Sequence, residues 1–99
     1  MKNNKIHSEQ YKKEVVEVIA RIAKDKTLLA DFVHDILTPK EYENIGVRWQ
    51  IVKRLAKGEK HESIARMLKL GVATVTRGSR EMRNQNGGFQ RTLKLFKLK

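Results

Sequence analysis

The feature that most constrains the fold is a pair of short amphipathic segments, His61–Leu68 and Val72–Met82, separated by only three residues. Two helices joined by so short a turn pack at roughly 90–120°, which requires a small residue at the crossing and apolar residues around it. Ala65 is the small residue. The surrounding apolar anchors are Ile64, Leu68, Leu70 and Val75. The spacing therefore predicts a helix-turn-helix over about residues 60–83.

One residue of this turn departs from the usual pattern. Lys69 occupies a position at which glycine is common, because the backbone there is left-handed. A left-handed conformation costs a residue with a side chain about 1 kcal/mol. We expect the turn to form at this cost.

Three further helices are predicted upstream, because apolar residues recur at steps of three and four over residues 11–23, 27–37 and 39–57. The third of these begins with a specific start signal. Thr38 is an N-cap, Pro39 stands at the first helical position, and Glu41 completes a capping box. Gly58 is placed to end this helix in a left-handed conformation.

The C-terminal segment Phe89–Lys99 follows a turn cluster at residues 84–88. Phe89, Leu93 and Phe96 would share one face of a sixth helix, whereas the last six residues alternate apolar and basic, as in a strand. The helical context upstream favours the helix. The predicted fold is thus all-α, a single domain over residues 1–99 with about six helices.

The helix over residues 39–57 carries apolar residues on two sides, which suggests two packing partners. One stripe contains Val47, Ile51 and Leu55, and the other contains Tyr42, Ile45, Trp49, Val52 and Ala56. A chain of 99 residues also buries only about 60–65% of its unfolded surface on its own. We therefore expect a homodimer, with Trp49 in the core.

The charge balance points to a polyanionic partner. Lys and Arg total 22 against 11 Asp and Glu, giving a net charge of +11 and a pI near 10.2. From Lys60 onward there are ten basic and two acidic residues, against twelve and nine before it. A polyanion is the expected partner of this second part.

Composition excludes several other classes. The sequence contains no cysteine, which removes disulfides and thiolate catalysis and is compatible with the cytoplasm. It contains neither a signal-peptide pattern nor an apolar run of membrane-spanning length. His7, His34 and His61 lack metal-ligand spacing, and no catalytic constellation is present, so we expect neither a metal site nor an enzyme.

Five segments together resemble the Trp repressor family, within a stretch from about Ile36 to Met82. They are Leu37–Glu41, Gly46–Arg48, Ile51–Val52, Gly58–Glu59 and Val72–Ser79. One residue fewer separates Glu59 from Ile64 than in the best-studied branch of the family. The resemblance implies an intertwined, all-helical homodimer whose helix-turn-helix units enter successive major grooves of a palindromic operator. It also implies a sequence-specific transcriptional regulator, most simply a repressor.

The resemblance and the residue types together give a set of candidate DNA contacts. Short and hydrogen-bonding residues of the second motif helix can contact base edges; these are Val72, Ala73, Thr74, Thr76, Arg77 and Arg80. Nearby cations can hold phosphates without reading sequence; these are Lys60, Arg66, Lys69 and Arg83. The alternative is a non-specific nucleic-acid-binding or architectural protein, and a weaker one is membrane-surface binding through the basic tail Phe89–Lys99.

The resemblance further implies a binding site for L-tryptophan as a corepressor; no other cofactor is expected. Arg48 and Arg77 match the two arginines that enclose the ligand, and Leu37, Thr38 and Gly78 match further contacts. Glu81 is a departure, because the tryptophan-binding branch has serine there. Glu81 could accept the ligand's ammonium group, or it could turn onto Arg48 or Arg77 and fill the pocket. A charge facing arginines is seldom left unpaired, which favours the second outcome.

Overall fold

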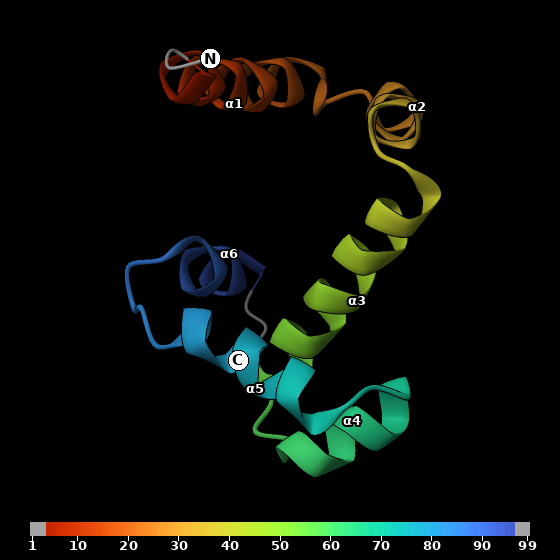
Figure 1. The fold of residues 1–99 in the computed structure, drawn as a ribbon, viewed down its shortest axis with the longest axis vertical. Helices are drawn as coiled ribbons and strands as arrows, with labels where there is room; N and C mark the ends of the chain where they lie inside the picture. The colour runs from red at the N-terminus through yellow and green to blue at the C-terminus, as the bar shows by residue number, and fades with distance from the viewer. Residues whose placement is uncertain (1–3, 97–99) are drawn as a thin grey trace. The chain divides into compact units, whose positions relative to one another are not determined.

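The computed structural model describes residues 4–96, and the side-chain environments of residues 7–96, as an all-helical chain (Figure 1). The helices are α1 (Asn4–Ile22), α2 (Lys26–Ile36), α3 (Pro39–Ala56), α4 (His61–Leu68), α5 (Val72–Met82) and α6 (Gly88–Phe96). The predicted all-α class is confirmed. The C-terminal segment is helical as far as Phe96, and its last three residues lie outside the described part.

The main difference from the predicted elements is at the start of α1, which begins at Asn4 and not at Tyr11. The prediction started at the first apolar position. The preceding turns are polar but contain residues that form helices readily, and Lys12 Nζ lies 3.1 Å from Glu9 Oε1 within α1. A helix can extend past its apolar face where local propensity supports it.

The chain divides into two compact units, Met1–Tyr42 and Glu43–Lys99. In the first unit α1 contacts α2, and Asp25 caps α2 by accepting a hydrogen bond from the Leu28 amide at 3.0 Å. None of the side chains from 7 to 42 is fully buried. Tyr11 and Val16 are 62% and 67% exposed, and Leu28 is 47% exposed. The apolar stripes of this unit therefore have no buried core within the unit itself.

The predicted capping box at the start of α3 is present. Thr38 Oγ1 accepts a hydrogen bond from the Glu41 amide at 3.1 Å, and Glu41 Oε1 accepts one from the Thr38 amide at 2.8 Å. The backbone hydrogen bond from Thr38, followed by the Thr38 side chain, lowers the pKa of the Glu41 carboxyl below its ordinary value. The carboxylate form of Glu41 thus stabilises the helix start.

This geometry predicts a pH dependence of stability that glutamine at position 41 should remove. Because the folded pKa is depressed, the contribution of Glu41 is present above its unfolded pKa and is lost as the pH falls through the folded pKa. We expect the wild type to lose stability relative to Glu41→Gln as the pH falls below about 4.5. Urea unfolding of both proteins at several pH values measures the difference; a pH-independent difference would contradict the assignment.

The second unit has a core formed where α3, α4 and α5 meet. Its fully buried members are Ile51, Ile64, Ala65 and Val75. Partly buried apolar residues surround them, namely Val47, Leu55, Leu68 and Leu70. Ala65 is 4% exposed and lies in this cluster, as the motif predicts for the small residue at the helix crossing. Figure 1 shows α4 crossing α5, with α6 beside α5.

Both predicted left-handed residues are present. Gly58, with φ +84°, follows α3, and Lys69, with φ 57° and ψ 49°, follows α4. In each case the next amide donates to a carbonyl five residues earlier: Glu59 to Arg54 at 3.1 Å, and Leu70 to Ala65 at 2.8 Å. This hydrogen bond is the mark of a Schellman cap, which ends each helix sharply. A residue with a Cβ is strained in this left-handed conformation. Lys69 adopts it because the turn and the packed core fix its backbone.

Candidate nucleic-acid interface and ligand pocket

Helix α5 presents one face to solvent and another to the core. Its buried side carries Val75, whereas Ala73, Arg77 and Arg80 are exposed and recur at helical spacing on one outward face. Val72 is 45% exposed at the helix start. The second motif helix is therefore packed by one side only, and its opposite side is open to a partner.

The two threonines of the predicted DNA face are less accessible. Thr76 is half-buried, and its Oγ1 lies 3.3 Å from His61 Nδ1 at the start of α4. Thr74 is half-buried as well, and its Oγ1 accepts a hydrogen bond from Arg77 Nη2 at 3.5 Å. The hydroxyl of Thr76 thus links the two motif helices. The contact of His61 with Thr76 could not be predicted from their spacing in the sequence.

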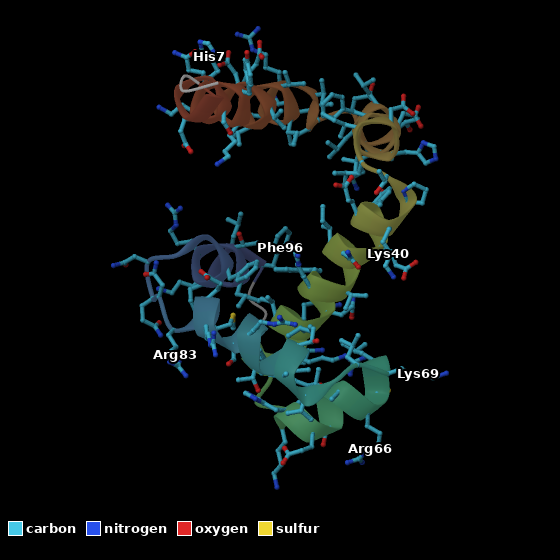
Figure 2. All side chains as sticks on the ribbon, in the orientation of Figure 1. His7, Lys40, Arg66, Lys69, Arg83 and Phe96 are labelled. Carbon is cyan, nitrogen blue, oxygen red and sulfur yellow. The ribbon has the colours of Figure 1, made fainter. Side chains whose placement is uncertain are left out.

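The predicted phosphate contacts all lie on the surface of the second unit. Lys60, Arg66, Lys69 and Arg83 are exposed, and within the described residues none of the four forms an ion pair. Figure 2 shows the side chains of Arg66, Lys69 and Arg83 directed away from the ribbon. Unpaired, exposed cations of this kind can neutralise phosphates and so release the counterions condensed on a nucleic acid, which gives affinity and salt dependence.

A cavity of about 490 Å³ lies in the second unit, within the size range of small-molecule sites. The residues that line it come from α3, α5 and α6, and they are Arg48, Ile51, Val52, Thr74, Arg77, Gly78, Glu81 and Phe89. Four predicted ligand residues, Arg48, Arg77, Gly78 and Glu81, therefore meet at one cavity. The other two predicted residues, Leu37 and Thr38, belong to the first unit, where Leu37 follows α2 and Thr38 caps α3.

Glu81 does not close this cavity by pairing with its arginines. Arg77 and Glu81 are four residues apart on α5, so their side chains leave the same face. No ion pair or hydrogen bond joins the Glu81 carboxylate to Arg48, Arg77 or any other described residue. Both signs of charge therefore stand at the rim of the same apolar cavity.

Gly78 has a packing role that the sequence did not indicate. A Cβ at this position would lie 3.0 Å from Ile51 Cγ2, so alanine there would require the Ile51 side chain to shift by a few tenths of an ångström. The resemblance implies only a ligand contact for Gly78, whereas the side chain of Ile51 lies directly beside it. The same glycine also lines the cavity.

Substituting this glycine with alanine should destabilise the second unit despite the better helix propensity of alanine. Overpacking lowers the free energy of unfolding by roughly 1–3 kcal/mol, and the higher helix propensity of alanine restores up to about 1 kcal/mol. Gly78→Ala should therefore lower the free energy of unfolding by about 1 kcal/mol. Gly46→Ala is the matched control, because nothing lies within 4 Å of a Cβ built there in α3. The control should gain about 0.5–1 kcal/mol. Urea unfolding measures the change in the free energy of unfolding for both variants. A change of the same sign in Gly78→Ala and Gly46→Ala would contradict the packing role of Gly78.

Phe89 is the pocket residue that sequence reasoning did not assign to a site. It is the second residue of α6, and the neighbouring Gln90 Nε2 donates a hydrogen bond to the Met82 carbonyl at 2.6 Å, which joins α6 to the end of α5. Phe89 and Glu81 also line a neighbouring hollow that contains Trp49. Trp49 is half-buried, not fully enclosed as expected for a core residue. The apolar face of the predicted tail helix was the available signal for Phe89.

Two further features of the described residues bear on function. No cluster of three or more histidine or acidic side chains with a metal-binding arrangement occurs among them. Within residues 4–96, no helix combines the length and apolar character needed to cross a membrane. His7 and His34, unlike His61, are exposed.

Comparison with known proteins places the chain in a family. Residues 10–97 match the family described as Trp repressor protein. A Trp operon repressor homolog of Vibrio parahaemolyticus is 34% identical over 93 residues, covering 91% of this chain and 89% of the relative. Its counterpart in Vibrio campbellii is 35% identical over 83 residues, covering 81% and 82%. The chain therefore belongs to the Trp repressor family of DNA-binding transcription regulators.

Proposed function

We propose that the chain is a homodimeric repressor that binds a palindromic operator in double-stranded DNA through α4 and α5. The observation that carries this proposal is the outward face of α5, where exposed Ala73, Arg77 and Arg80 stand on a helix packed by its opposite side. Arginine and small side chains on such a face can contact base edges in the major groove. Lys60, Arg66, Lys69 and Arg83 would hold the flanking phosphates.

The exposed apolar residues support the dimer. In the first unit Tyr11, Val16 and Leu28 lack a core, and on α3 Tyr42 and Ile45 are 40% and 48% exposed. Scattered exposed apolar residues are ordinary, but two helices in which none of the side chains from residue 7 to residue 36 is buried are not. A second copy that packs against α1, α2 and the early part of α3 would bury these stripes.

L-tryptophan is the proposed corepressor, and the cavity beside α5 is its proposed site. The cavity offers two guanidinium groups for a carboxylate and for the face of an aromatic ring. A ligand held between α3 and α5 would fix the angle of α5, and with it the spacing of about 34 Å that two half-sites require. Leu37 and Thr38 remain predicted contributors.

Selection of binding sites from a random duplex library, with and without L-tryptophan, tests the proposal. We expect a palindrome with half-sites about one helical turn apart, and a fluorescence anisotropy titration should show at least a hundredfold preference for it over a scrambled duplex. Equal affinity for both duplexes at physiological salt, with a steep salt slope, would instead identify a non-specific nucleic-acid-binding protein.

A further inference from the structure

The cavity beside α5 has an unusual charge composition for a carboxylate-binding site. Arg48 and Arg77 provide two positive charges, but Glu81 adds a negative charge at the same cavity, and the remaining walls include Ile51 and Phe89. A site for a simple anion is expected to exclude a carboxylate, because like charges repel across a few ångströms. The presence of both signs favours a ligand that itself carries both.

Local geometry explains why Glu81 is available to a ligand. Arg77 precedes Glu81 by four residues on α5, the weaker of the two orientations for a helical ion pair. The Arg77 guanidinium instead donates to Thr74 Oγ1 at 3.5 Å, one turn in the opposite direction. Among the described residues the Glu81 carboxylate has no partner. Its charge is therefore not neutralised within the described part of the chain.

We propose that Glu81 is the specificity-determining residue of this cavity and makes a protonated amino group a requirement for tight binding. The ligand class is an aromatic α-amino acid in its zwitterionic form. Its carboxylate binds Arg48 or Arg77, its ring lies against the apolar walls, and its ammonium group pairs with Glu81. Aromatic carboxylates without an amine are rejected, because they bring a second negative charge to Glu81 and nothing to pair with it. This inference rests on the proposed ligand site.

Calorimetric titration with two matched probes tests the role of Glu81. L-tryptophan and indole-3-propionate share the indole ring and the carboxylate, and only the former has the amine. Wild type should bind L-tryptophan about tenfold or more tightly than indole-3-propionate, since one probe gains an ion pair and the other meets a repulsion. Glu81→Gln should reduce this preference to about threefold or less, because it weakens the binding of L-tryptophan and strengthens the binding of indole-3-propionate.

A matched control separates this effect from a change in net charge. Glu62→Gln removes the same charge from an exposed position on α4 that does not line the cavity, and it should leave the preference of the wild type unchanged. Raising the ionic strength should reduce the preference of the wild type and of Glu62→Gln but not that of Glu81→Gln. Helical circular dichroism confirms that each variant is folded.

The remaining outcomes each overturn the inference in a recognisable way. An equal preference in wild type and Glu81→Gln would show that Glu81 does not select the ligand, while the ligand site would stand. L-tryptophan binding to Glu81→Gln alone would show that Glu81 fills the site as an internal partner. Absence of binding in every folded variant would overturn the ligand site itself, and operator selection without ligand would still test the repressor proposal separately.

Discussion

Replacing Ile64 by alanine is expected to lower the free energy of unfolding by about 2–5 kcal/mol, a large part of what a small unit can hold. Ile64 is 0% exposed and packs with Ile51, Ala65 and Val75 where α3, α4 and α5 meet. Removing its outer carbons leaves a cavity among three helices whose positions the motif fixes. Loss of this contact should also abolish DNA binding, because α5 would no longer be held in place.

Met67→Ala is the matched control for this prediction. Met67 lies on the same helix three residues away but is 65% exposed, so its loss should change stability by less than about 0.5 kcal/mol. Urea unfolding followed by circular dichroism measures both variants, and anisotropy with a selected duplex measures binding. If Ile64→Ala were as stable as Met67→Ala, the core described for the motif would be incorrect.

The helix-turn-helix was predictable because its requirements are local. A small residue, four apolar anchors and a three-residue turn fall within a short stretch, and α4 and α5 begin and end at the predicted residues. The left-handed backbone of Lys69 followed from the same spacing, although lysine is an unfavourable residue there. The capping box was equally predictable, because its hydrogen bonds depend on only two residues, Thr38 and Glu41, at a fixed spacing.

Features that depend on how helices approach each other were not predictable in the same way. Phe89 lines the cavity because α6 lies against α5, and neither the turn before it nor its spacing fixes that contact. Thr76 was predicted to contact DNA from its position in the motif, but His61 at the N-terminus of α4 lies beside its hydroxyl. Gly78 faces Ile51 for the same reason. Periodicity identifies a face of a helix, whereas tertiary packing decides what that face meets.

The apolar pattern also predicts burial without saying which chain provides it. The stripe that starts at Tyr42 and Ile45 is as regular as that of Val47, Ile51 and Leu55. Its later member Val52 is buried, whereas Tyr42 and Ile45 are 40% and 48% exposed. This exposure is part of what led us to propose a homodimer. A single sequence contains no sign of whether the partner of a stripe is the same chain or another copy.

Arg77→Ala is expected to weaken both DNA and ligand binding, which few single substitutions in this chain should do. Arg77 is exposed on the outward face of α5 and also lines the cavity with Arg48 and Glu81. Loss of an arginine contact to a base edge costs roughly 1–3 kcal/mol, or about five- to 150-fold in affinity. Loss of a guanidinium from the proposed ligand site should lower the affinity for L-tryptophan by about tenfold.

Two further variants separate the roles that Arg77 combines. Arg80→Ala removes an exposed arginine of the same helix that does not line the cavity, so it should weaken DNA binding and leave L-tryptophan affinity unchanged. Arg91→Ala removes an exposed arginine of α6. It should leave the affinities for DNA and for L-tryptophan unchanged, apart from a small effect on the salt dependence of DNA binding. Anisotropy and calorimetry on the three proteins give the comparison. If Arg77→Ala behaved like Arg80→Ala, the ligand would have to act on α5 through other cavity residues, and the link between pocket and DNA face would lie in the packing of α3 against α5.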